Sequence, residues 1–195
     1  MTSVSQIKKN KNKKKGFSLV EITLVVFITV VISSVVIFKY NDFSDSIELE
    51  NIALDVILSV REAQVFGISS RGTTTEESFF YAYGVRFAST SADIDSFISF
   101  VDSEGDNLWY DTSGEQFRKV TFKEGYKINK LCVANPTEVC GQIELDILFK
   151  RPDVNAIIKT GENATAASSS RIELISPSGA TTSVNISESG QVYMN

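Results

Sequence analysis

The longest feature of the hydrophobic pattern is an apolar run near the N-terminus. Residues 17–38 read FSLVEITLVVFITVVISSVVIF, and Glu21 is their single charged residue. β-Branched residues dominate the run and favour strands in water, but soluble strands rarely exceed about ten residues. A helix of this length spans roughly 33 Å, close to the hydrocarbon core of about 30 Å. The pattern predicts a transmembrane helix over 17–38, with a buried core helix as the alternative.

The pattern becomes amphipathic over residues 39–70. Apolar residues recur there every three or four positions among charged ones: Leu49, Ile52, Ala53, Val56, Val60 and Ala63. This spacing predicts a continued helix with one apolar stripe, and the glycines and serines from Gly67 onward predict its end. We expect the stripe to pack beneath a sheet.

Strands are predicted for the remainder of the chain. Apolar and polar residues alternate over 81–87 and 143–149, as in half-buried strands. Shorter runs of similar composition lie at 97–101, 117–122, 128–133, 172–175, 183–186 and 191–193, and SPSG at 176–179 predicts a hairpin turn. The expected fold class is α+β: a long N-terminal helix packed on a mainly antiparallel β-sheet domain over 71–195.

Charge is distributed unevenly. Residues 1–16 hold six lysines and no acid, so the rest of the chain has 13 basic and 24 acidic residues, a balance of −11 against −5 overall. The positive-inside rule then predicts a single-pass protein with a cytoplasmic N-terminus and an extracytoplasmic C-terminal domain. A cleaved secretory signal is the rival, but the apolar run is too long and no small-residue cleavage site follows it.

Glu21 stands out because a carboxylate at the centre of a membrane span costs about 2.5–3.5 kcal/mol and is usually functional. The alternative is that Glu21 reaches water at the cytoplasmic edge. Its setting favours function, since the segment 13–21, KKKG followed by FSLVE, resembles the leader and cleavage site of type IV prepilins and pseudopilins.

The resemblance implies three roles. A prepilin peptidase cuts between Gly16 and Phe17, Phe17 is N-methylated, and Glu21 is the assembly residue. Cutting removes the six lysines and leaves an amine on Phe17, for which the carboxylate of an adjacent subunit is a counter-charge. The C-terminal domain resembles the H-type minor pseudopilins of type II secretion, through REAQ at 61–64 and LFKRPD at 148–153.

The function implied is a non-enzymatic structural subunit, a minor pseudopilin or pilin, of a type II secretion or type IV pilus-like filament. Its parts are the leader 1–16, the span 17–38, the helix continuation 39–70 and the domain 71–195. The implied location is the bacterial inner membrane and then a periplasmic or extracellular filament. The implied partners are a prepilin peptidase, other pilin or pseudopilin subunits, an inner-membrane assembly platform and the lipid bilayer. Alternatives are a major pilin of a motility, adhesion or DNA-uptake fibre, and a signal-anchored extracellular binding module that does not polymerise.

Composition argues against enzymatic chemistry. The chain has no histidine and two cysteines, which removes histidine-dependent triads, three-histidine zinc sites and four-thiolate metal sites. No phosphate-binding or dinucleotide motif is present, so we expect no catalytic residues. Nucleic-acid binding is disfavoured because the chain beyond the leader is strongly acidic.

Two further candidate sites lie in the C-terminal domain. Cys132 and Cys140 bracket a seven-residue loop, and in an oxidising compartment this spacing favours a hairpin disulfide over free thiols. The acids Asp102, Glu104, Asp106 and Asp111 surround a turn and are a calcium candidate, with a solvated acidic turn as the alternative. No other cofactor is expected.

Overall fold

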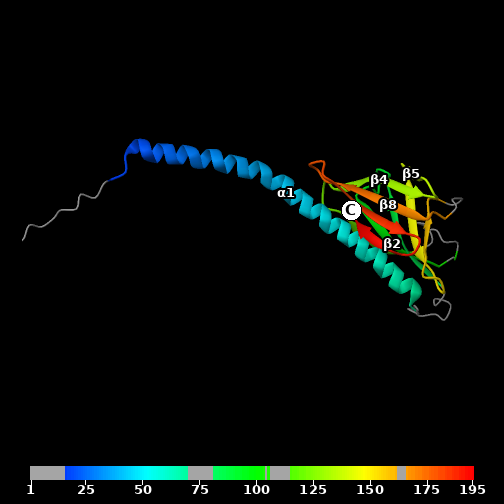
Figure 1. Cartoon of the computed structure of the whole chain (residues 1–195). Helices are drawn as coiled ribbons and strands as arrows, with labels where there is room; N and C mark the ends of the chain where they lie inside the picture. Colours follow the sequence, from blue (N-terminus) through cyan, green and yellow to red (C-terminus); the bar gives the residue numbers. More distant parts are fainter. Residues whose placement is uncertain (1–15, 70–80, 104, 106–114, 162–165) are drawn as a thin grey trace, which may run out of the picture. The chain divides into compact units, whose positions relative to one another are not determined.

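The computed structural model describes residues 16–69, 81–103, 105, 115–161 and 166–195, without the side chains of 36 and 38–42. The fold is α+β, with helix α1 (Leu19–Ile68) followed by ten strands that form two antiparallel sheets. The chain divides into two compact units, Met1–Asn41 and Asp42–Asn195, and α1 contributes to both. Figure 1 shows the second part of α1 lying beside the sheets.

Each sheet has five strands. Sheet A has the order β3-β2-β1-β6-β7, with bounds β1 Ala82–Ala88, β2 Ser96–Asp102, β3 Gln116–Thr121, β6 Glu144–Phe149 and β7 Ala156–Lys159. Sheet B has the order β10-β9-β8-β4-β5, with bounds β4 Lys127–Ala134, β5 Glu138–Cys140, β8 Ser169–Ile175, β9 Thr181–Ser187 and β10 Val192–Met194.

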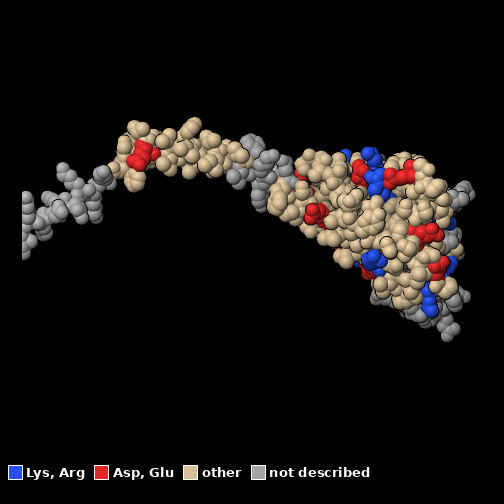
Figure 2. Space-filling view, in the orientation of Figure 1, with Lys and Arg blue, Asp and Glu red and all other residues tan. Residues whose placement is uncertain are grey.

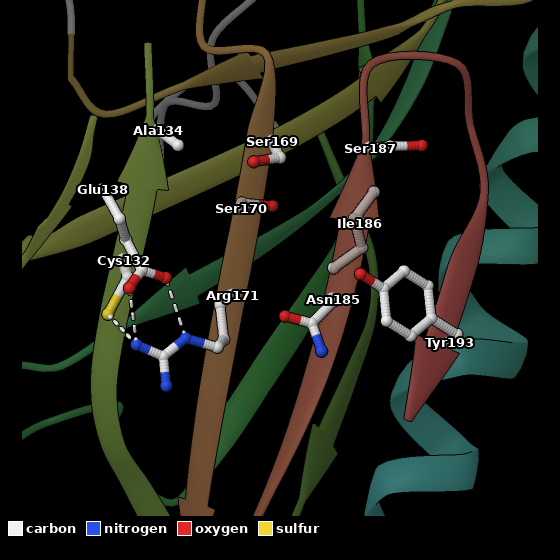
Figure 3. Close-up of a pocket in the computed structure, with 10 residues that line it drawn as sticks. All are labelled: Cys132, Ala134, Glu138, Ser169, Ser170, Arg171, Asn185, Ile186, Ser187 and Tyr193. Atoms are coloured by element: carbon white, nitrogen blue, oxygen red, sulfur yellow. Dashed lines mark hydrogen bonds and ion pairs between the residues drawn. The ribbon is translucent and has the colours of Figure 1, made fainter. Parts of the chain in front are cut away.

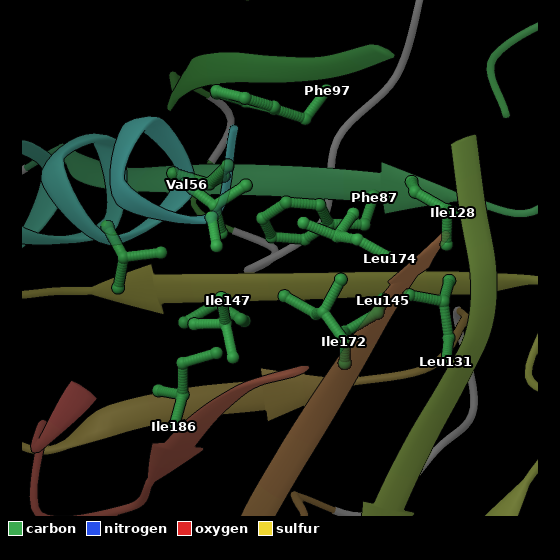
Figure 4. Close-up of a cluster of buried hydrophobic side chains, with 14 of the residues drawn as sticks. Val56, Phe87, Phe97, Ile128, Leu131, Leu145, Ile147, Ile172, Leu174 and Ile186 are labelled. Carbon is green, nitrogen blue, oxygen red and sulfur yellow. The ribbon is translucent and has the colours of Figure 1, made fainter. Parts of the chain in front are cut away.

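The hydrophobic core joins α1 to both sheets (Figure 4). Val56 of the helix, Phe87 and Ile147 of sheet A, and Ile172 and Ile186 of sheet B belong to one buried cluster. The six stripe residues predicted from the sequence are all at most 6% exposed, so the prediction of a core-facing stripe is confirmed. Burial of such side chains is the main stabilising contribution in a domain of this kind.

The strand predictions are confirmed for eight of the ten strands, and the predicted turn at 176–179 joins β8 to β9. In that turn the amide of Gly179 donates to the carbonyl of Ser176 at 3.0 Å, and Gly179 has a φ of 88°, which glycine adopts without steric cost. Strands β5 and β7 were not predicted. They have three and four residues.

The predicted membrane span is wrong. In the part of the chain that the structure describes, no helix is both long enough and apolar enough to cross a bilayer. This overturns the transmembrane helix at 17–38 and the single-pass inner-membrane location that depended on it. The sequence argument took the length and apolar composition of 17–38 as sufficient for a span, and it counted Phe17 and Ser18, which precede α1.

The end of α1 is fixed to the domain by polar contacts. Arg61 Nη1 donates to Gln64 Oε1 at 2.7 Å and to the carbonyl of Gly190 at 2.9 Å. Glu62 forms an ion pair with Arg118 of β3 at 2.5 Å. Arg61 and Glu62 of the REAQ segment therefore anchor the helix to the domain.

Candidate functional site

The N-terminal end of the described chain leads directly into α1. Gly16 is exposed and a Cβ there would meet nothing within 4 Å, so the peptide bond between Gly16 and Phe17 is open on the glycine side. The carbonyl of Ser18 accepts from the amides of Glu21 at 3.0 Å and Ile22 at 3.2 Å. Helical hydrogen bonding therefore begins immediately after the predicted cleavage position.

Glu21 occupies a position that also suits the helix start. Ser18 immediately precedes the helix and Glu21 is its third residue, which is the Ser-x-x-Glu spacing of a capping box. An acid in the first turn is also favoured by the helix dipole. The sequence interpretation considered intersubunit contact and solvent access for Glu21, and it did not consider this capping spacing of Ser18 and Glu21.

The first part of α1 presents apolar side chains to solvent. Thirteen large apolar residues between Leu19 and Ile37 are 47–78% exposed: Leu19, Val20, Ile22, Leu24, Val25, Val26, Phe27, Ile28, Val30, Val31, Ile32, Val35 and Ile37. In Figure 2 this stretch is uncharged except for one acidic patch near its start. We call these thirteen residues the apolar segment.

Three hydroxyl side chains that lie among the residues of the apolar segment donate to the helix backbone. Thr23 Oγ1 donates to the carbonyl of Val20 at 2.9 Å, Thr29 Oγ1 donates to that of Val26 at 2.8 Å, and Ser34 Oγ donates to that of Val31 at 2.8 Å. These hydroxyls turn back onto their own backbone and leave the surface apolar. Exposed apolar surface on this scale marks an interaction site.

Phe17 and Glu21 share one side of the helix start. Both line an apolar hollow together with Ile22, Val25 and Val26. The residue that would carry the new amine and the predicted assembly carboxylate are thus brought together in the structure.

The predicted disulfide is present. Cys132 of β4 and Cys140 of β5 are opposite each other in the strand register and their sulfur atoms are bonded. Cys132 is buried and Cys140 is exposed. The bond ties the short edge strand β5 to the rest of sheet B.

A polar row crosses the same face of sheet B. The strand register aligns Cys140, Cys132, Arg171, Asn185 and Tyr193. Figure 3 shows the last four of these residues, with Glu138 beside Cys132 and Arg171. Arg171 donates from Nε and Nη2 to the two oxygens of Glu138 at 2.8 and 2.9 Å, and its Nη2 lies 3.6 Å from each sulfur. The hydrogen bond from Arg171 lowers the pKa of Glu138.

This row does not offer a metal site in its present state. Cys132, Glu138 and Cys140 place their ligand atoms within 4.8 Å of one another. Metal-binding cysteines are thiolates, whereas these two sulfurs are bonded to each other, and Glu138 is held by Arg171.

Only one of the four candidate calcium ligands, Asp102, lies within the described residues. Glu104, Asp106 and Asp111 lie outside the described residues. Asp102 is buried at the end of β2, and its Oδ1 accepts from the amide of Gly105 at 2.6 Å. This bond is local turn chemistry, and calcium binding stays a prediction.

A buried charged pair in sheet A was missed by the sequence analysis. Arg86 Nη1 lies 3.1 Å from the carboxylate of Asp146, directly across from it in the register of β1 and β6, and Arg86 Nη2 lies 2.7 Å from Glu144. Burial raises the pKa of Asp146 to about 6, partly opposed by Arg86 and Lys159. Perturbed carboxylates accompany functional sites and structural ion pairs alike, and here the strand pairing accounts for the pair. The sequence signal for this pair was one basic and one acidic residue, Arg86 and Asp146, each at a polar position of a predicted strand.

Comparison of the chain with family models, curated proteins and solved structures finds no match.

Proposed function

We propose that this protein is a non-enzymatic structural subunit, a minor pseudopilin or pilin, of a type II secretion or type IV pilus-like filament. In this proposal a prepilin peptidase cuts after Gly16, Phe17 is methylated, and copies or related subunits assemble through the first part of α1. A pilin-like arrangement of helix and sheets belongs to the same proposal.

The observation that carries the proposal is the exposed apolar segment. Covering apolar surface contributes about 25 cal/mol per Å² removed from water, and thirteen large side chains offer far more area than a solitary helix can bury against itself. Helices of the same kind from other subunits provide a matching apolar surface around the whole circumference. A filament in which these helices pack together covers the segment.

Glu21 supplies specificity to that packing. Cleavage after Gly16 leaves an amine on Phe17, next to the hollow that Glu21 also lines. Among packed apolar helices an amine needs a counter-charge, and removal of one partner of such a pair costs about 3–5 kcal/mol. The Glu21 carboxylate of a neighbouring subunit meets this need and sets the axial position of each added subunit.

The test compares three variants of the full chain in cells that contain a prepilin peptidase. Glu21→Ala is expected to be processed normally and to fold, while its incorporation into sheared or cross-linked filaments falls by at least about tenfold, which corresponds to a loss of about 1.4 kcal/mol. Gly16→Leu is expected to stay uncut, because a peptidase subsite must accept the backbone at this position without a side chain.

The matched control is Glu124→Ala, which removes an exposed carboxylate outside α1. It is expected to behave as wild type. Intact mass and N-terminal sequencing report the cut, whose product is residues 17–195 with one added methyl group. Normal incorporation of Glu21→Ala, or wild-type protein that remains full length, would contradict the proposal and favour a binding module that does not polymerise.

A further inference from the structure

The outer face of α1 in the unit Asp42–Asn195 carries a second stripe, distinct from the apolar segment. Its eight positions follow one another at intervals of three or four residues: Phe43, Ile47, Glu50, Leu54, Leu58, Arg61, Val65 and Ile68. The six apolar members are 37–64% exposed, and Glu50 and Arg61 are also exposed. We call these eight residues the outer stripe.

The outer stripe lies opposite the core stripe. At about 100° per residue, its members fall within a sector of about 80° on the side of the helix away from Leu49, Val56 and Val60. The core stripe is buried against the sheets, so the outer stripe lies on the far side of the helix. At its edges Leu58 lines a hollow beside β3, and Arg61 reaches the carbonyl of Gly190. It extends over 25 residue steps, or about 38 Å.

The order of residue types in the outer stripe is self-complementary. From either end the order is apolar, apolar, charged, apolar. The charged position seven residues after Phe43 is Glu50, and the one seven residues before Ile68 is Arg61. The two halves therefore match in hydrophobicity and are opposite in charge.

An antiparallel second copy satisfies every position of this pattern. Phe43 then meets Ile68 of the second copy, Ile47 meets Val65, and Leu54 meets Leu58. Glu50 of each copy meets Arg61 of the other. A two-fold axis repeats each contact, as in an isologous interface, and charges that flank an apolar helix seam fix its orientation and register.

Arg61 is held in position for this contact. Its Nη1 donates to Gln64 and to the carbonyl of Gly190, which restrains the side chain while the residue stays exposed. A guanidinium has five donor hydrogens in a planar fork, so it also serves an incoming carboxylate.

A parallel arrangement uses the stripe less well. A neighbour shifted by 11 residues, about 16–17 Å, also places Glu50 opposite Arg61. In such a pair one Arg61 and one Glu50 have no partner on the other copy. Pairing them requires a third copy on the same side of the same helix. Two neighbours displaced by so little along one seam overlap, because α1 has 50 residues.

We propose that the outer stripe docks a second copy of this chain in an antiparallel, two-fold arrangement. The proposal goes beyond filament assembly, since it uses the other end of α1 and neither Phe17 nor Glu21.

The first experiment is a charge exchange in the full chain. Glu50→Arg alone places arginine opposite Arg61 twice per dimer, and Arg61→Glu alone places two carboxylates together twice. Each variant is expected to weaken dimerisation by roughly tenfold or more in sedimentation equilibrium. An equimolar mixture of the two restores both opposite-charge contacts and is expected to dimerise within about threefold of wild type. Glu124→Arg, a charge reversal at an exposed acid outside α1, is the matched control and is expected to dimerise as wild type.

The second experiment determines register and does not depend on the charge variants. Ile47→Cys with Val65→Cys in one chain is expected to form covalent dimers with a short bismaleimide, because these positions adjoin in the antiparallel pair. In Ile47→Cys with Leu58→Cys the two positions adjoin each other only in the parallel arrangement, so cross-linked peptides that join 47 to 58 are expected to be few when the products are identified by mass. The native cysteines are bonded to each other and do not react.

Dimers through 47 and 65 together with recovery on mixing support the proposal. Single charge variants that dimerise as wild type, a mixture no tighter than its components, preferential cross-linking through 47 and 58, or no cross-linking overturns it. Cleavage after Gly16 and filament incorporation are scored separately with Glu50→Arg, which leaves the Glu21 contact intact, so failure of this proposal is distinguishable from failure of the proposed function.

Discussion

At the residue scale, Asp146 shows how position changes the chemistry of a side chain. Its carboxyl is fully buried beside Arg86, and burial raises its pKa from 3.8 to about 6. The folded protein therefore holds this proton at pH values where the unfolded chain has released it. Because the folded state binds more protons, the stabilising contribution of Asp146 is greatest near pH 4 and is lost as pH rises through about 6.

Replacing Asp146 with Asn removes the titration and keeps an oxygen that accepts from Arg86. The free energy of unfolding of wild type relative to Asp146→Asn is expected to fall by on the order of 2–3 kcal/mol between pH 4 and pH 7, as a shift of about two pKa units implies. Urea unfolding of both proteins over this range measures it. Parallel pH profiles for the two proteins would show that Asp146 titrates in the same way folded and unfolded.

At the element scale, Gly67 lets α1 approach strand β6 closely. A Cβ at Gly67 would overlap the carbonyl oxygen of Phe149 and lie 2.7 Å from its carbonyl carbon and 2.8 Å from its Cβ. The obstacle is the backbone of a paired strand, which moves less readily than a side chain.

Gly67→Ala is therefore expected to destabilise the protein by about 1–3 kcal/mol, the usual range for an overpacked contact. Alanine favours a helix over glycine by about 1 kcal/mol, so a stabilising result would show that the strand yields. Ser44→Ala, at an exposed position of the same helix, is the control and is expected to change stability little. Thermal or urea unfolding measures both variants.

The β4–β5 pair is the element that the disulfide Cys132–Cys140 secures. Strand β5 has three residues, all exposed, and contributes little to the core. The native protein is expected to resist alkylation until it is reduced and then to gain the mass of two hydrogen atoms. The double variant Cys132→Ala, Cys140→Ala is expected to lose about 2–3 kcal/mol of stability, from the entropy of closing a short loop.

The double variant under reducing conditions is the control, because a reductant should then have no further effect. Complete alkylation of both cysteines without reductant, in protein from its native compartment, would show that the bond does not form there.

At the scale of the whole molecule, α1 serves two surfaces with different chemistry. The apolar segment presents apolar side chains around the helix, and one carboxylate, Glu21, lies near its start. The outer stripe is a single seam with one acid and one base. We expect the apolar segment to support extended assembly. We expect the outer stripe to bind one second copy, because a stripe on one side of a helix accommodates one neighbour.

Charge also differs along the whole chain. The six lysines of residues 1–16 offset part of the acidic remainder. If Gly16 is cleaved as proposed, the net charge of the product changes from −5 to −11, and mutual repulsion between acidic domains then opposes nonspecific association.

Much of the local structure follows from the sequence. The three- and four-residue spacing of Leu49, Val56 and Val60 predicted a helix face that the structure buries. Alternation predicted two strands, and runs of similar composition predicted six more. The spacing of Cys132 and Cys140 favoured the bond that the structure contains. These predictions are confirmed because periodicity and short-range spacing depend on backbone geometry within one element.

The membrane span was predicted wrongly from the same kind of information. The count of apolar residues over 17–38 took no account of where the helix begins, and it treated the acid in the first turn as a functional residue within the span. The roles proposed for Gly16, Phe17 and Glu21 rest on sequence resemblance and on the exposed surface of α1, and they remain to be tested.

The sequence by itself determined which residues of each element share a face, because side-chain direction repeats every 3.6 residues in a helix and every two in a strand. Only the tertiary structure decided that the strands divide into two sheets and that Arg86 lies across from Asp146. Only the tertiary structure decided which of the two apolar faces of α1 is covered. Strand order, long-range pairing and the burial of one face over another depend on contacts between residues far apart in the chain, which no local period records.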